Sequence, residues 1–155
     1  MGTLADDSGL KTVTGGSGAD TIDATGFETG LETLEINSGA GIDTLTGATS
    51  GSVVLYGGSA IDVLTGGGSD DSFKYGSTSE MGTSLNSSET ISSFSDGDDL
   101  IWLAWAVDFA EDLTISSNGV NTTIQVKQDG QDDGYLQLVG IADASLITSD
   151  DFTFG

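Results

Sequence analysis

Large apolar residues recur at a fixed place among small and polar residues in the first half of the chain. Residues 15–23 read GGSGADTID, with small residues first, an aspartate in sixth place and a large apolar residue in eighth place. The same order recurs at 38–46 (SGAGIDTLT), 57–65 (GGSAIDVLT) and 66–74 (GGGSDDSFK), and a weaker copy without the aspartate fills 47–55 (GATSGSVVL). A repeat of fixed period predicts a solenoid, in which each short unit stacks on the next.

Each nonapeptide predicts a tight turn followed by a short strand. Glycine allows the backbone angles that such a turn needs, and alternate residues of a strand point to opposite faces. We therefore expect the residue in eighth place to point into the interior, and two nonapeptides to make one full coil. A further degenerate copy at 6–14 would open the roll. The expected inward side chains are Ile22, Leu45, Val54, Leu64 and Phe73.

The positions of the aspartates predict which turns stack on one another. Asp20, Asp43, Asp62 and Asp71 are separated by 23, 19 and 9 residues, which fits the repeat with two short insertions. On this count Asp43 and Asp62 lie on one flank of the roll. Asp71 lies on the other flank, stacked on the degenerate turn at Ser52, and Asp20 has no well-matched partner.

The second half of the chain changes to patterns of longer strands. The segment 91–103 predicts a strand, an acidic turn and a second strand. Further on, the dipeptide Asn118-Gly119 is a strong hairpin signal, which indicates that the strands around it form an antiparallel meander. The predicted strands of this meander are 113–117, 121–127 and 135–141.

These patterns predict an all-β chain in three parts. Residues 1–76 are expected to form a parallel β-roll, that is, a solenoid of short stacked strands. Residues 77–90 are a polar loop without apolar order, and residues 91–155 are expected to form a small antiparallel β cap.

Charge narrows what such a roll can bind. The 155 residues include 25 Asp or Glu and 3 Lys or Arg, giving a formal net charge of -22. Nucleic acids and anionic membrane surfaces are bound through basic patches, and no apolar stretch reaches the roughly 18 residues of a membrane helix. We therefore expect no nucleic-acid binding and no membrane insertion. The charge also opposes compaction, so an acidic chain with apolar strands indicates a cation as the missing component.

The residue types exclude several kinds of catalysis. The sequence contains no His and no Cys, which excludes Ser–His, Cys–His and zinc–His chemistry. Its glycine runs recur with aspartate and form no P-loop or dinucleotide fingerprint. Spacing alone does not exclude paired carboxylates for glycoside hydrolysis, but the repeats give most acidic residues another role. We expect a module that is not an enzyme and that uses a metal, in place of disulfides, to stabilise its fold.

The nonapeptide resembles the calcium-binding repeat of the repeats-in-toxin family, G-G-x-G-x-D-x-U-x, where U is a large apolar residue. Calcium takes about six to eight oxygen ligands, which turn carbonyls and aspartate carboxylates supply together. The resemblance implies that residues 1–76 form a right-handed calcium-binding β-solenoid, with several calcium ions held between stacked turns. The implied ligands are Gly15, Ser17, Gly18, Asp20, Ser38, Gly39, Gly41, Asp43, Gly57, Ser59, Ala60, Asp62, Gly66, Gly68, Ser69 and Asp71.

The C-terminal half resembles the end of type I secreted members of the same family. It matches their I-x-x-F-x-x-G-D-D-x-I segment at 91–101 and ends near a D-D-F-x-F motif at 150–154. The resemblance implies further calcium ligands at Asp96, Asp98 and Asp99. It also implies export by type I secretion machinery, namely an ABC transporter, an adaptor and an outer-membrane channel. The chain would then fold on meeting extracellular calcium, in a secreted or cell-surface protein.

Two other functions fit the same patterns. One is a calcium-dependent structural or assembly domain of a surface-layer protein or large adhesin, with self-association on a cell surface. The other is a carbohydrate-binding module of a secreted enzyme, although Lys11, Lys74 and Lys127 are few and scattered for an anionic polysaccharide. We expect Trp102 and Trp105 to be core residues that close the end of the roll, because a terminal repeat needs a cap. Ligand binding is the alternative role for these two residues.

Overall fold

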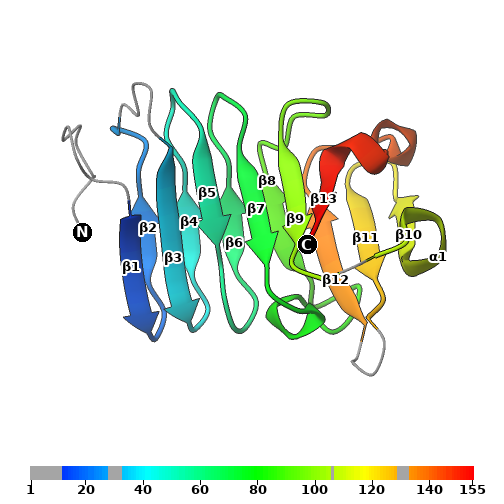
Figure 1. The fold of residues 1–155 in the computed structure, drawn as a ribbon, viewed down its shortest axis with the longest axis horizontal. Coiled ribbons are helices and arrows are strands. Elements are labelled where there is room, and N and C mark those ends of the chain that lie inside the picture. The colour runs from blue at the N-terminus through cyan, green and yellow to red at the C-terminus, as the bar shows by residue number, and fades with distance from the viewer. Residues whose placement is uncertain (1–11, 28–32, 106, 129–132) are drawn as a thin grey trace.

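The fold is a β-roll in which successive strands alternate between two facing sheets (Figure 1). The structure is a computed structural model that describes residues 12–27, 33–105, 107–128 and 133–155. The first sheet consists, in order across it, of β1 (Thr12–Ser17), β3 (Leu34–Ala40), β5 (Val53–Tyr56), β7 (Ser72–Tyr75), β9 (Leu100–Leu103) and β13 (Phe152–Phe154). The second sheet consists, in order, of β10 (Leu113–Ser117), β11 (Thr122–Val126), β12 (Gly134–Leu138), β8 (Glu89–Ser92), β6 (Val63–Thr65), β4 (Thr44–Thr46) and β2 (Thr21–Asp23). The predicted all-β class and parallel roll are confirmed.

Apolar side chains from the two sheets form stacked ladders that fill the interior. The ladder of the first sheet is Ile36, Leu55, Phe73 and Ile101, each paired with the next by strand register and each 0% exposed. The ladder of the second sheet is Leu45, Leu64 and Ile91, equally buried. Each such side chain contributes about 1.5–3 kcal/mol when fully buried. The inward direction predicted for Leu45, Leu64 and Phe73 is confirmed, and Ile22 packs against the same core while partly buried.

The degenerate copy is shifted by one residue from its predicted frame. Val53 and Leu55 are both 0% exposed, whereas Val54 is only half-buried, so the prediction that Val54 points inward is wrong. The register pairs Leu55 with Phe73, and this puts Val53 rather than Ser52 beside Asp71. Three apolar residues in a row hide the alternation of a strand, and only the pairing between strands selects which face is buried.

Parallel pairing continues beyond residue 76. The strand β8 pairs in parallel with both β6 and β12, and β9 pairs in parallel with both β7 and β13. The predicted antiparallel meander is also present, as β10, β11 and β12. Its first turn is closed by the Asn118 N–H, which donates to the Asn121 carbonyl at 3.2 Å. Both sheets continue across the expected boundaries. The division of the chain into three domains stays a prediction.

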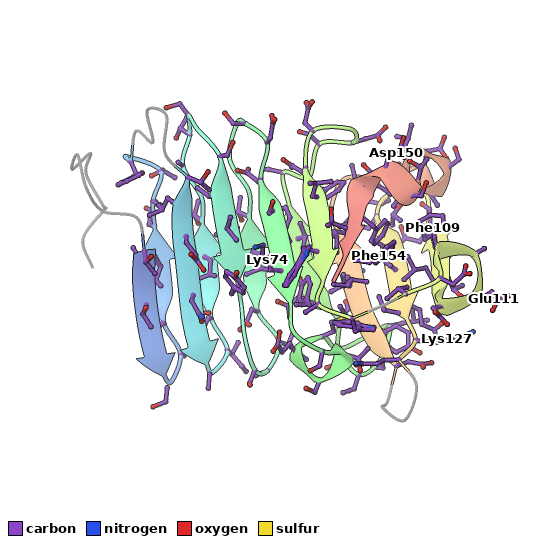
Figure 2. The ribbon with its side chains drawn as sticks, in the orientation of Figure 1. Lys74, Phe109, Glu111, Lys127, Asp150 and Phe154 are labelled. Carbon is purple, nitrogen blue, oxygen red and sulfur yellow. The ribbon has the colours of Figure 1, made fainter. Side chains whose placement is uncertain are left out.

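Short helical segments connect some of the later strands. These segments are α1 (Phe109–Asp112) and the 3-10 turns η1 (Thr78–Glu80), η2 (Ala144–Leu146) and η3 (Ser149–Asp151). The ring of Phe109 packs edge-on against Phe152 at 5.5 Å between centroids, and Phe152 stacks on Phe154 at 6.1 Å; Figure 2 labels Phe109 and Phe154. In the part of the chain that the structure describes, no helix has the length and apolarity of a membrane span.

The two tryptophans lie in different environments. Trp105 is partly buried and packs against the core, as predicted. Trp102 alternates with the buried Ile101 and Leu103 and therefore points out of the roll, so its prediction as a core residue is wrong. Its ring lies 4.7 Å from the ammonium nitrogen of Lys74, which Figure 2 shows on the face of the first sheet turned to the viewer.

Ala60 has a positive φ angle, which residues with a side chain rarely adopt. It takes the third glycine position of the repeat 57–65 and has φ of 92°, a conformation that costs a residue with a Cβ about 1 kcal/mol or more. We predict that Ala60→Gly raises the free energy of unfolding by roughly 0.5–1 kcal/mol, after subtracting the entropy that glycine adds to the unfolded chain. Urea denaturation in one fixed buffer measures this change.

The matched control for this substitution is Ala104→Gly, at an exposed position outside the left-handed region. It should lower the free energy of unfolding slightly, because only the unfolded-state entropy changes there. An equal decrease in the free energy of unfolding in both variants would contradict the backbone strain assigned to Ala60.

Candidate metal centre

Four acidic residues form a continuous row at one edge of the second sheet. Asp20, Asp43 and Asp62 immediately precede β2, β4 and β6, and Glu89 is the first residue of β8. The N–H of Asp20 donates to Asp43 Oδ1 at 2.7 Å, and the N–H of Asp43 donates to Asp62 Oδ1 at 2.7 Å. The N–H of Asp62 donates in turn to Glu89 Oε2 at 2.9 Å. We call Asp20, Asp43, Asp62 and Glu89 the first carboxylate row.

The first residue of each nonapeptide makes room for the carboxylate of its own aspartate. A Cβ on Gly15 would lie 2.7 Å from Asp20 Oδ2, and a Cβ on Gly66 would lie 2.8 Å from Asp71 Oδ2. Both distances are shorter than a van der Waals contact, so a side chain at these positions would displace the carboxylate. Ser38 takes this place in the second copy, where it is buried and its hydroxyl donates to the Gly57 carbonyl at 2.6 Å.

Half of the oxygens in the buried part of the first row have no partner. Asp43, Asp62 and Glu89 are 0% exposed, and Asp43 Oδ2, Asp62 Oδ2 and Glu89 Oε1 have no hydrogen-bond partner among the described residues. A buried polar atom without a partner is costly, and a buried charge is more so. The row therefore leaves three oxygens that need a proton or a cation.

Burial also changes the acidity of this row. Loss of water raises the pKa of Asp62 to about 6, with a further contribution from the charge of Asp43. The same loss of water, together with the charges of Asp62, Glu80 and Asp43, raises the pKa of Glu89 to about 9. In both groups a backbone N–H bonded to the carboxylate acts in the opposite direction. The charged forms of Asp62 and Glu89 are therefore destabilised in the folded chain.

A second carboxylate row, consisting of Asp71 and Asp99, precedes strands of the first sheet. The N–H of Val53 donates to Asp71 Oδ1 at 2.9 Å, and the N–H of Asp71 donates to Asp99 Oδ1 at 2.8 Å. Their remaining oxygens accept from their own turns, since Gly67 N–H bonds Asp71 Oδ2 at 2.5 Å and Ser95 N–H bonds Asp99 Oδ2 at 2.9 Å. Burial raises the pKa of Asp71 to about 6 and also raises that of Asp99. All four oxygens of this row have backbone donors.

The turns that precede the first row stack closely on one another. The N–H of Ser59 donates to the Gly39 carbonyl at 3.0 Å, and the N–H of Gly41 donates to the Ser59 carbonyl at 3.1 Å. The N–H of Gly18 donates to the Ala40 carbonyl at 2.6 Å. Backbone hydrogen bonds thus join successive coils before the row, as the stacking of nonapeptide turns requires.

The predicted ligands divide among three places. Asp20, Asp43 and Asp62 share the first row, so the expectation that Asp20 lacks a stacking partner is wrong. Asp71 and Asp99 share the second row. The prediction that all of the small residues before each aspartate lie in a turn is wrong for two copies, because Gly15 and Ser17 lie in β1 and Ser38 and Gly39 lie in β3. The turns before the first row contain the other predicted ligands, Gly18, Gly41, Gly57, Ser59 and Ala60, and the turn before Asp71 contains Gly66, Gly68 and Ser69. Asp96 and Asp98 are exposed in the turn between β8 and β9.

Glu89 is the member of the first row that sequence reasoning missed. It lies outside every nonapeptide, in the stretch predicted as a polar loop. A signal was nevertheless present, because Glu89-Thr90-Ile91-Ser92 repeats the order of acid, polar residue, large apolar residue and polar residue found at Asp20 and Asp43.

The donor set fits a hard cation. Within the described parts of the chain, no three acidic side chains form a compact metal-binding group. A calcium ion at the first row would therefore take carboxylate oxygens from neighbouring members and complete its ligands with turn carbonyls and water. The three oxygens without partners are of the type that calcium prefers, and the buried negative charge is what a divalent cation offsets.

Comparison with known proteins supports the fold. No protein-family model matches the sequence, and no curated protein matches it. The solution structure of the AlgE6R2 subunit from the Azotobacter vinelandii mannuronan C5-epimerase is similar, with a TM-score of 0.64 and 19% identity over 94% of this chain and 92% of that chain. The AlgE6R3 subunit of the same enzyme has a TM-score of 0.65 and 20% identity over 99% of this chain and 84% of that chain. The shared feature is the β-roll.

The raised pKa values predict how stability depends on pH when divalent cations are removed. Glu89 keeps its proton up to about pH 9 when folded but has an ordinary pKa of 4.5, so folding takes up a proton between these values. Its contribution to stability is therefore fully present below about pH 4.5 and is lost as the pH rises through about 9, at about 1.4 kcal/mol for each pH unit in between. In a chelator, we expect circular dichroism to show more folded protein at pH 5 than at pH 9.

The variant Glu89→Gln should weaken this pH dependence, because it removes the titrating group and keeps an oxygen that accepts from the Asp62 N–H. Glu111→Gln is the control, since Glu111 is exposed on α1 (Figure 2). Stability in chelator that rises from pH 5 to pH 9 would contradict the assigned protonation.

Proposed function

We propose that this chain is a calcium-dependent folding module of a secreted protein, and that calcium binds along the first carboxylate row. The observation that carries the proposal is the row itself, where buried carboxylates stack and three of their oxygens have no partner among the described residues. The nonapeptide repeats resemble those of the repeats-in-toxin family, which agrees with this site. The module would bind and fold rather than catalyse a reaction, since the sequence has no His or Cys.

Charge couples calcium binding to folding in this proposal. A net charge of -22 repels the compact state, and the first row places part of that charge in the interior. Calcium that binds the folded chain more tightly than the unfolded chain stabilises the fold by mass action. Extracellular modules bind calcium with dissociation constants of about 0.1–1 mM, so the chain would stay unfolded inside the cell and fold outside it.

An unfolded, acidic chain is also suited to export. We propose that the type I machinery of ABC transporter, adaptor and outer-membrane channel carries it while cytoplasmic calcium is scarce. The support for this step is the resemblance of residues 91–101 and 150–154 to the end of type I secreted proteins. In the folded chain, the second of these segments becomes η3 and β13, and β13 pairs with β9.

Calcium titration tests the proposed function. We expect calcium to convert the circular dichroism of a disordered chain into that of a β protein. Asp43→Asn should require on the order of tenfold more calcium, because it removes one charged ligand and keeps the acceptor for the Asp20 N–H. Asp150→Asn is the control, since Asp150 is exposed at the C-terminal end of the roll (Figure 2), and its midpoint should match that of the unaltered chain.

A β spectrum that stays unchanged in excess chelator would overturn the proposal.

Light scattering during the same titration tests whether the chain is instead a structural or assembly domain. Self-association that depends on calcium would favour a domain of a surface-layer protein or adhesin, whereas a monomer at every calcium concentration would exclude it.

A second candidate function is carbohydrate binding by the outer face of the first sheet. Lys74 lies between two aromatic rings there, at 5.5 Å from the centroid of Tyr56 and 4.7 Å from that of Trp102. Aromatic faces stack on sugars, and an ammonium pairs with a uronate carboxylate. The solved neighbours are subunits of an enzyme named for acting on mannuronan, which supports a uronate polysaccharide as the ligand.

Oligouronate titration tests this second function. We expect the ligand to change tryptophan fluorescence and Trp102→Ala to abolish binding, because it removes one of the two outward rings beside Lys74. Lys74→Met should weaken binding and reduce its salt dependence, since it keeps the bulk of the side chain and removes the charge. Identical affinity in the Trp102→Ala variant would exclude the site.

A further inference from the structure

Glu89 takes the place of a repeat aspartate in a coil that has no nonapeptide. Strand register pairs Val63 with Thr90 and Leu64 with Ile91, which sets Glu89 beside Asp62. The segment before Glu89 is Ser87-Ser88, so the glycine turn that surrounds each repeat aspartate is missing here. The first row therefore ends on a longer side chain held by a different kind of segment.

Two oxygens without partners face the same point beside Gly57. The position that a Cβ on Gly57 would occupy lies 2.9 Å from Glu89 Oε1 and closer still to Asp62 Oδ2. Both atoms are buried and lack hydrogen-bond partners among the described residues. The two oxygens therefore lie close to each other, as two carboxylate ligands of one calcium ion do. A side chain at Gly57 would collide with both oxygens.

Tyr75 is a second, independent buried group without a partner in this region. Its ring is 0% exposed, and its hydroxyl has no hydrogen-bond partner in the described chain. Burial and the charges of Glu89, Asp62 and Glu80 raise the pKa of this hydroxyl well above its ordinary value, so it stays neutral. A neutral hydroxyl is able to donate a hydrogen bond or to offer its oxygen as a ligand.

We propose that Asp62 and Glu89 hold a calcium ion between them over Gly57, at the end of the first row. This inference rests on the proposed function and extends it to a residue outside the repeats. The other carboxylate oxygen of Glu89, Oε2, accepts the Asp62 N–H, and Oε1 lies on the side of Gly57, close to Asp62 Oδ2. The oxygens of Asp62 and Glu89 supply charge, and carbonyls or the Tyr75 hydroxyl complete the coordination.

The site would link the repeats to the C-terminal half. Glu89 opens β8, and β8 pairs with β6 of the repeats on one side and with β12 of the meander on the other. An ion held by Asp62 and Glu89 therefore bridges the last coil of the repeats and the strand on which the meander is built. Calcium at this site would order the repeats and the C-terminal half together, whereas an ion between two nonapeptides would order the repeats alone.

Isothermal titration calorimetry of the full chain with calcium alone tests the site. We expect Glu89→Gln to bind one calcium ion fewer than the unaltered chain, and Glu111→Gln, the exposed control, to bind the same number. In chelator, Glu89→Gln should be as stable as the unaltered chain or more stable, because the neutral amide needs no proton taken up on folding and keeps the acceptor for the Asp62 N–H. If Glu89 served only to stabilise the fold, Glu89→Gln would be less stable than the unaltered chain in chelator.

The outcomes separate this inference from the proposed function. A chain that binds no calcium overturns both. Calcium binding by Glu89→Gln with the same number of ions and the same affinities overturns only the site at Glu89. Should Glu89→Gln not fold, Gly57→Ala decides the question, since its Cβ would push Asp62 Oδ2 and Glu89 Oε1 from their places without needing a left-handed backbone. Undiminished ion binding by Gly57→Ala would then overturn the site.

Discussion

The structure depends on the bond between the backbone N–H of one coil and the carboxylate of the next. In the first row this bond joins Asp20 to Asp43, Asp43 to Asp62 and Asp62 to Glu89. Each bond fixes where a strand of the second sheet begins, and so it fixes the register of the apolar side chain two residues further on. The same interaction that aligns the coils also stacks like charges in the interior, so the fold and its need for a cation have one origin.

The two rows meet this constraint in different ways. In the second row each turn supplies a second N–H, from Gly67 or Ser95, to the oxygen left over by the bond between coils. In the first row the leftover oxygens of Asp43, Asp62 and Glu89 receive no such donor among the described residues. The second row is complete as polypeptide, whereas the first is complete only with a proton or an ion. The roll therefore combines one flank that the chain stabilises by itself with one that responds to its surroundings.

The apolar interior and the carboxylate rows limit each other. The ladders of Ile, Leu and Phe supply the favourable free energy of burial, but each coil buries only a few large side chains, such as Leu34, Ile36 and Leu45. A thin core of this kind cannot offset many buried charges. Extending the roll by further coils adds core and charge in the same proportion, so length alone does not remove the dependence on a cation. The C-terminal meander changes that proportion, because β11 and β12 add Ile124, Val126, Leu136 and Leu138 to the core.

The sequence by itself determined the class of fold, the repeat strands, the meander and the aspartates, because glycine turns and apolar alternation are local and are written in residue order. It did not determine that Val53 and Leu55 point inward, since three apolar residues in succession fit either face. It did not distinguish Trp105 in the core from Trp102 on the surface. Only the tertiary structure brought Glu89 into the row of Asp20, Asp43 and Asp62. That position follows from the pairing of β8 with β6 across 27 residues, and pairing at such a distance is set by packing and not by any local pattern.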